Sequence, residues 1–100
     1  MSERNSITLL AELAFAEPVA ETELLALAAV VGATRQEPGC LMSVAHVHTE
    51  NPRRVLFYER WQDQAALDAH NASAHLDAFR AVVGPRLAAP SQLGFWKHLD

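Results

Sequence analysis

Two histidines in the second half of the chain, His70 and His75, are the residues best suited to chemistry near neutral pH. An imidazole gains and loses its proton in this range, so it can take a proton from a substrate and return it. Five positions separate the two residues, which would place them about 140° apart around an uninterrupted helix. We therefore expect the side chains to converge only if the helix breaks between them.

The residues around the histidines predict such a break. Asp63 can cap a helix that begins at Gln64, and the segment Asn71-Ala72-Ser73 interrupts the helical pattern. Ser73 can then cap a second helix, which ends near Gly84-Pro85. The sequence thus predicts two short helices that meet at an angle between the histidines.

Each histidine has a catalytic and a structural interpretation. His70 continues the apolar stripe of Leu67, which suits either a general base in a protected pocket or a core histidine bonded to a backbone carbonyl. His75 follows the second cap by two residues, where the helix N-terminus disfavours the positive form. It is therefore a second candidate base, or else a surface residue of the first helical turn.

Side chains on a predicted strand and on the two helices could line a pocket beside the histidines. Aromatic residues in such positions usually pack in the core, but a pocket for a flat aromatic molecule needs the same kind of wall. The candidate pocket residues are Phe57, Glu59, Trp61, Leu67 and Phe79. Glu59, if it points inward, needs a partner, for which Arg35 and Arg80 are candidates.

Other residues do not predict a metal or cofactor site. His46 and His48 share one face of a predicted strand, but a metal would need further ligands, and Glu50 is the nearest candidate. Cys40 follows a turn glycine without a local histidine motif, so we do not expect a nucleophile there. The chain contains no Gly-rich phosphate loop or nucleotide-binding fingerprint. We expect no metal and no cofactor.

Hydrophobic periodicity predicts the elements that hold these residues. They alternate as β-α-β-β-α-β, the order of ferredoxin-like α+β domains, in which helices cover one face of a four-stranded antiparallel sheet. The predicted strands are residues 7–15, 41–48, 54–61 and 93–99. The predicted helices are residues 19–36, a helix from Gln64 to the break at residues 71–73, and a helix from the Ser73 cap to near Gly84-Pro85.

The predicted strands carry large apolar residues on both faces, although helices can cover only one. In the strand over residues 54–61, Phe57 and Trp61 lie on one face, and Leu56 and Tyr58 lie on the other. An apolar sheet face in water is unfavourable, so we expect a second copy of the chain to cover it. The sequence thus predicts a homodimer formed through the sheet.

Composition limits the classes of function. One hundred residues fit one domain, residues 1–100, and a net charge of −4 without a basic run disfavours nucleic acid as a partner. The first residues do not resemble a signal peptide, and no apolar stretch is long enough for a membrane span. The single cysteine, Cys40, fits a reducing compartment. We expect a cytoplasmic protein.

The segment from Tyr58 to Phe79 combines a Glu59-Arg60-Trp61 strand end with the Asp63 cap and both histidines. With Glu37-Pro38-Gly39-Cys40 upstream, it resembles the antibiotic biosynthesis monooxygenase family, most closely the quinol-monooxygenase-like type. The resemblance covers nearly the whole chain. It implies a ferredoxin-like sandwich of the dimeric α/β-barrel type, a family in which some members oxidise electron-rich aromatics with O2 and no cofactor.

The resemblance implies a monooxygenase acting on a quinol-like or polyphenolic aromatic, with His70 or His75 as the base. Polyketide-oxidising members place an asparagine and a tyrosine where this chain has Phe57 and Leu67, which cannot relay protons. Haem-degrading members place a tryptophan at the position of His70 and the haem-ligating histidine at the position of Arg80. Haem degradation is therefore not expected.

Two other functions fit the same fold, because a fold does not determine a reaction. One is a non-catalytic dimeric module for small-ligand binding or stress response, which would have a filled core and a hydrogen-bonded His70. The other is an isomerase, which would use the same base without consuming oxygen. The monooxygenase hypothesis predicts a cavity lined by Phe57, Trp61, His70, His75 and Phe79.

Overall fold

The computed structural model describes residues 3–99. It contains four strands and three α-helices in the predicted order, with two short 3-10 helices at Glu3–Asn5 and Gly84–Arg86. The strands are β1 (Ile7–Ala14), β2 (Cys40–Val47), β3 (Arg54–Trp61) and β4 (Gln92–Lys97), and the helices are α1 (Glu21–Arg35), α2 (Gln64–Asn71) and α3 (Ala74–Val83).

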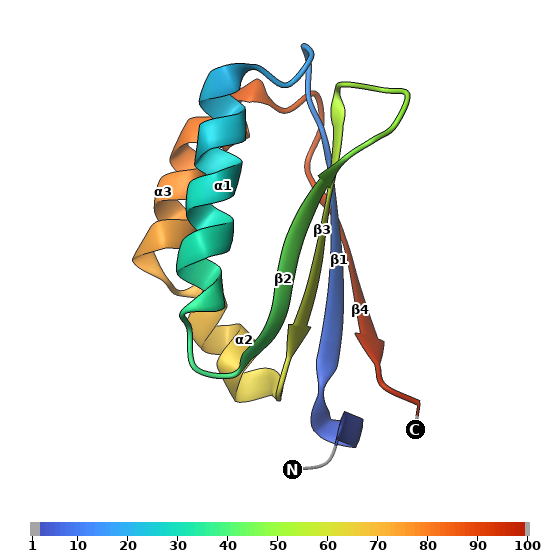
Figure 1. The fold of residues 1–100 in the computed structure, drawn as a ribbon, viewed down its shortest axis with the longest axis vertical. Helices are drawn as coiled ribbons and strands as arrows, with labels where there is room; N and C mark the ends of the chain where they lie inside the picture. Colours follow the sequence, from blue (N-terminus) through green and yellow to red (C-terminus); the bar gives the residue numbers. More distant parts are fainter. Residues whose placement is uncertain (1–2, 100) are drawn as a thin grey trace.

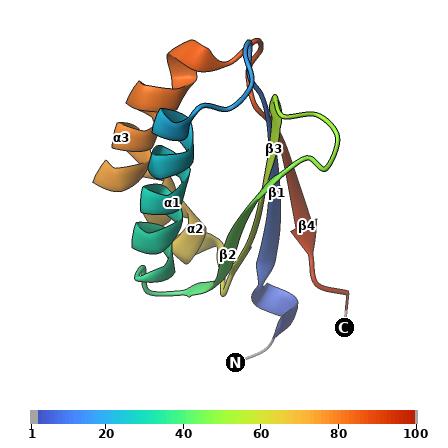
Figure 2. The ribbon, with the colours of Figure 1, turned by 45° about the horizontal axis from the view of Figure 1, so that its top comes forward.

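The strands form one antiparallel sheet in the order β2-β3-β1-β4. All three α-helices lie on the same face of this sheet, which leaves its other face open (Figures 1 and 2). The α+β ferredoxin-like fold expected from the sequence is therefore confirmed. Within residues 3–99, no helix combines the length and the apolar character needed to cross a membrane.

The helix-facing side of the sheet carries the core. Along β1 and β3, buried residues alternate with more exposed ones, as the sequence pattern predicts. Trp61, at the end of β3, is completely buried and packs with Ile7, Leu9 and Leu67. A second cluster around Phe57 and Val83 fills the space between the sheet and the helices α1 and α3.

The last strand is only partly covered on this inner face. Leu93 lies opposite Ala11 and Phe95 lies opposite Leu9, so both point to the helix side of the sheet. They nevertheless remain 58% and 55% exposed. The β4 edge is therefore the place where the interior of the molecule opens to solvent.

The break between α2 and α3 forms through the two predicted caps. Asp63 accepts a hydrogen bond from the backbone N–H of Ala66 at 2.9 Å, which starts α2. Ser73 accepts one from the backbone N–H of Leu76 at 3.3 Å, which starts α3. Side-chain caps of this kind satisfy N–H groups that have no partner within the helix.

Several predicted boundaries shift by one to two residues. Helix α1 begins at Glu21 rather than residue 19, because the carboxylate of Glu23 accepts the backbone N–H of Ala20 at 2.9 Å and fixes the start there. Strand β1 ends at Ala14, and Phe15 makes only an isolated bridge to Leu87. Strand β2 begins at Cys40 and β4 spans Gln92–Lys97.

The turn between α1 and β2 requires glycine at position 39. Gly39 has a φ of +85°, which side-chain-bearing residues rarely adopt. A Cβ atom at this position would lie 2.5 Å from the Cβ of Ala66, in the first turn of α2. The Gly39 carbonyl also accepts the backbone N–H of Gln62 at 2.9 Å. The turn is thereby held directly against the start of α2.

We expect Gly39→Ala to lower the free energy of unfolding by about 2–4 kcal/mol, because it combines an unfavourable φ with a steric overlap. Urea unfolding followed by circular dichroism measures this change. Gly32→Ala in α1 is the matched control: the added methyl meets open space and should raise stability by about 0.5–1 kcal/mol. An unchanged stability of Gly39→Ala would contradict this account of the turn.

Candidate active site

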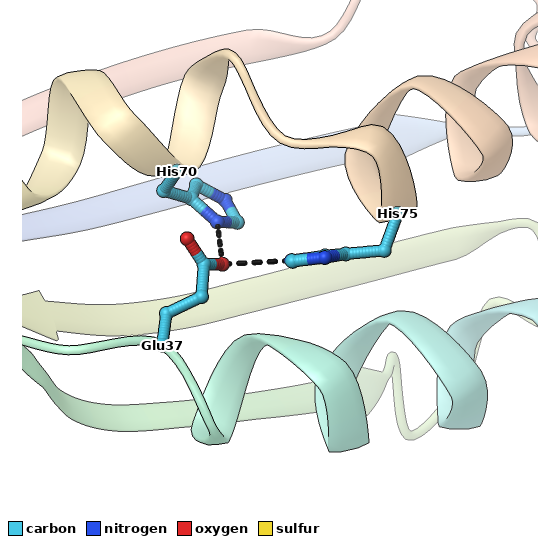
Figure 3. Close-up of side chains that lie close together, drawn as sticks. All are labelled: Glu37, His70 and His75. Atoms are coloured by element: carbon cyan, nitrogen blue, oxygen red, sulfur yellow. Dashed lines mark hydrogen bonds and ion pairs between the residues drawn. The ribbon is translucent and has the colours of Figure 1, made fainter.

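A carboxylate from the α1–β2 turn lies between the two histidines. Glu37 Oε2 is 2.7 Å from His70 Nδ1 and 2.7 Å from His75 Nε2 (Figure 3). Three elements meet here: the turn supplies Glu37, the end of α2 supplies His70, and the first turn of α3 supplies His75. The helix break predicted from the sequence is thus what lets both rings reach one acceptor.

Sequence reasoning did not select Glu37 as a site residue. It stands 33 positions before His70, and the sequence marks its segment through the Pro38-Gly39 turn and as part of the family resemblance, without indicating a contact with the histidines. The turn was recognised, but the direction of the Glu37 side chain depends on the contact between Gly39 and α2. That contact has no local signature in the sequence.

The shared acceptor fixes the protons on both rings. An ionised carboxylate oxygen only accepts hydrogen bonds, so His70 Nδ1 and His75 Nε2 must both carry hydrogen. A neutral imidazole has one N–H, so Nε2 of His70 is left with a free lone pair. This is the arrangement of a general base whose ring is oriented by a carboxylate.

His70 is nearly enclosed, with a side chain that is 4% exposed. Its ring lies against the indole of Trp61, with ring centroids 4.6 Å apart. Its Nε2 atom lies 3.7 Å from Oε1 of Glu59, which also accepts the indole N–H of Trp61 at 3.0 Å. The imidazole is therefore held between two carboxyl groups, one at each nitrogen.

Glu59 is buried on β3 within this arrangement. Burial raises the pKa of its carboxyl above the ordinary value, and the charge of Glu37 acts in the same direction. The positive charge that His70 carries when protonated and the Trp61 hydrogen bond act the opposite way. Protonation of Glu59 is thus made easier, and a protonated carboxyl would carry a donor next to His70 Nε2.

Arg35 and Arg80, the partners predicted for Glu59 from the sequence, make other contacts in the structure. The side chain of Arg35 donates to the backbone carbonyl of Ser43 at 2.8 Å. Arg80 forms a long, exposed ion pair with Asp77 at 3.6 Å. The expectation of an arginine partner for Glu59 is replaced by the indole of Trp61 and the imidazole of His70.

An apolar cavity of about 170 Å³ adjoins His70. It lies between the inner face of the sheet and α3, and it reaches the β4 edge at Leu93 and Phe95. Among the residues predicted for a site, the cavity wall includes Phe57, Glu59, His70 and Phe79.

The other predicted site residues lie beside the cavity. Trp61 and Leu67 are buried behind its wall in the core cluster that supports His70. His75 lies on the far side of Glu37, contacts a separate shallow hollow beside α1, and is partly exposed. Of the two histidines, His70 alone is on the wall of the cavity.

The trio Glu37, His70 and His75 also has the donor types of a transition-metal site, with ligand atoms within 4.8 Å of one another. In the observed arrangement the two ring nitrogens donate to the same oxygen. Metal binding would require both nitrogens to lose these protons.

The contacts of His48 and Cys40 suit structural roles rather than catalysis. His48 Nδ1 accepts backbone N–H groups of Glu50 and Asn51 at 3.0 and 3.1 Å and so shapes the β2–β3 turn. Burial raises the pKa of the Cys40 thiol, as do the negative charges of Glu59 and Glu37. A raised pKa disfavours the thiolate, so Cys40 is poorly suited to act as a nucleophile.

Comparison with known proteins places this site in a family. Residues 6–82 match the family described as antibiotic biosynthesis monooxygenase. The chain belongs to this family. The matched residues include the turn at Glu37, both histidines and most of the cavity wall, and the match confirms the resemblance to the family inferred from the sequence.

The chain is also similar to two proteins of other organisms. Rv0793 from Mycobacterium tuberculosis, a provisionally named monooxygenase, is 38% identical over 84 residues, which cover 83% of this chain and 82% of that protein. The uncharacterised sll1783 protein of Synechocystis is 28% identical over 82 residues, or 81% of this chain. The match spans 56% of the length of sll1783.

Solved structures share the whole fold. Rv0793 superposes with a TM-score of 0.84 and 28% identity, covering 95% of this chain and 96% of that chain. PA3566 from Pseudomonas aeruginosa gives a TM-score of 0.88 and 26% identity over the full length of both chains. A family member from Nitrosomonas europaea gives 0.89 at 19% identity, covering 95% and 91%, a likeness in fold alone.

Proposed function

We propose that this protein is a cofactor-independent monooxygenase that oxidises a quinol-like aromatic with O2. The observation that supports this most directly is the position of His70 at the wall of an apolar cavity, with its Nδ1 2.7 Å from Glu37 Oε2. A base in a dry pocket can deprotonate a phenolic hydroxyl, and the anion then has enough reducing power to react with O2 directly.

In the proposed reaction, one hydroquinone and one O2 give one hydroxyquinone and one water. His70 Nε2 takes a hydroxyl proton, and the anion gives one electron to O2 to form a semiquinone and superoxide. These combine at a ring carbon, and His70 returns its proton to the resulting peroxide. The O–O bond then breaks. The distal oxygen and its hydrogen leave as water together with the hydrogen of that ring carbon, and the oxygen that stays on the carbon becomes a carbonyl. The substrate loses four electrons and O2 gains four.

The protein's own groups have defined roles in this scheme. Glu37 orients His70 and stabilises its imidazolium form, because its negative charge lies 2.7 Å from Nδ1. His75 holds the carboxylate of Glu37 from the other side. Phe57 and Phe79, which meet edge to face with ring centroids 5.7 Å apart, form an aromatic wall for a flat ring.

We also propose that the protein is a homodimer formed through the open face of the sheet. This face carries Leu56 and Tyr58 on β3, and it also carries Met42 on β2 and Trp96 on β4, which are 42% and 59% exposed. Large apolar side chains on an uncovered face favour association with a second copy. Helices occupy only the other face (Figure 2).

The oxygenase proposal predicts protein-dependent O2 uptake with hydroquinones, measured on metal-free protein and corrected for autoxidation. His70→Ala should lower the rate about 100-fold or more, because a positioned base contributes at least that factor. The control is His48→Asn, whose amide oxygen can still accept the turn hydrogen bonds and which should keep the wild-type rate. Circular dichroism verifies that each variant is folded.

Undiminished uptake in folded His70→Ala would rule out His70 as the base. No uptake above background in the wild type would shift the balance toward the two alternatives. An isomerase would convert the same aromatics without consuming O2, and a binding module would retain them unchanged. Product analysis of the same samples separates these two.

The dimer proposal predicts that light scattering gives twice the mass of one chain in solution. Leu56→Asp should give the mass of one chain, because it places a charge at the centre of the apolar face. Leu25→Asp on α1, where the leucine is 66% exposed, is the matched control and should remain dimeric. A wild-type protein that elutes as a monomer at micromolar concentration would contradict the proposal.

A further inference from the structure

The size and the polar groups of the cavity limit the substrate further. We infer that it is a single-ring hydroxyarene with an anionic substituent, and that Arg80 binds this substituent. The identity of the reacting hydroxyl rests on the proposed function. The binding itself does not, and it can be measured without oxygen.

The cavity volume sets the number of rings. At about 170 Å³ it is close to the roughly 150 Å³ of an apolar cavity that holds one benzene molecule. One ring with small substituents fits within such a space, whereas a fused three-ring skeleton would extend past its open β4 edge. The half-exposed Leu93 and Phe95 at the β4 edge give a substituent a way out toward solvent.

The charged groups of the cavity wall are unevenly distributed along it. Glu59 and His70 adjoin each other on β3 and at the end of α2, with Glu37 directly behind His70. Arg80 is the cation among the described residues that line the cavity. It lies on α3, about 6 Å further along the helix axis than Leu76, another wall residue. The carboxyl groups thus lie at the His70 end of the cavity, and the cation lies further along its wall on α3.

This asymmetry orients a ligand that carries an anion. The carboxyl groups of Glu37 and Glu59 repel an anionic substituent from the His70 end, and Arg80 attracts it further along the wall. The neutral hydroxyl is then left at His70, where the free Nε2 can accept its proton. Attraction of the anionic substituent to Arg80 therefore places the reactive hydroxyl at His70.

Arg80 is available for this contact. Its ion pair with Asp77 is long, at 3.6 Å, and the two side chains are 55% and 71% exposed. Exposed pairs of this kind contribute little stability, so exchange for a ligand carboxylate is easy. A guanidinium can bind a carboxylate through two parallel hydrogen bonds, which fixes the orientation of the ligand as well as its position.

The test is anaerobic calorimetry with four probes: a dihydroxybenzoate, its methyl ester, hydroquinone and a three-ring anthraquinone carboxylate. We expect the dihydroxybenzoate to bind the wild type about tenfold more tightly than the ester, since a charge-assisted hydrogen bond supplies at least that factor. In Arg80→Gln the acid and the ester should bind within about twofold of each other. Arg80→Lys should keep part of the preference, because lysine retains the positive charge but lacks the two parallel N–H donors of the guanidinium.

Arg86→Gln is the matched control, because Arg86 carries the same charge on the adjoining 3-10 helix outside the cavity wall. It should keep the tenfold preference. Equal affinity of acid and ester in the wild type, an undiminished preference in Arg80→Gln, or tight binding of the three-ring acid would overturn the inference. Selective binding of the dihydroxybenzoate without O2 uptake would support it and contradict the oxygenase proposal. O2 uptake with neutral quinols but not with the dihydroxybenzoate would contradict the inference about the anionic substituent and support the oxygenase proposal.

Discussion

The arrangement of the site depends on one shared hydrogen-bond acceptor, the Oε2 atom of Glu37. It receives a ring N–H from His70 and another from His75, each at 2.7 Å. Because an ionised carboxylate cannot donate, this pairing determines which nitrogen of His70 carries hydrogen and which presents a lone pair. A buried imidazole without such a partner would have no fixed tautomer and no charge to stabilise its protonated form.

The fold brings these groups together through backbone features that are far apart in the chain. Gly39 lets the turn that carries Glu37 pack against the first turn of α2. The Ser73 cap starts a new helix in a direction that lets His75 point toward Glu37. On the opposite side of His70, the Trp61 indole fixes both the ring and the carboxyl group of Glu59. The base is thus positioned by a turn, a helix break and a buried aromatic residue together.

The sequence was sufficient for the parts of the structure that depend on local patterns. Period-two alternation predicted the faces of β1 and β3, and the Asp63 and Ser73 caps predicted the break that lets the histidines converge. It was insufficient for side-chain partners set by packing between distant segments. Glu37 was missed as a site residue, and the partners proposed for Glu59 were arginines rather than the indole and imidazole found beside it.

The central claim is that neutral His70 carries its hydrogen on Nδ1 and presents Nε2 to the cavity. Long-range ¹H–¹⁵N correlation spectra of the imidazole rings measure this directly, with the His70 signals assigned by their absence in His70→Ala. The account predicts the Nδ1–H tautomer in the wild type and its loss in Glu37→Leu, where no carboxylate holds that hydrogen. An Nε2–H tautomer in the wild type, or a tautomer that does not respond to Glu37→Leu, would contradict it.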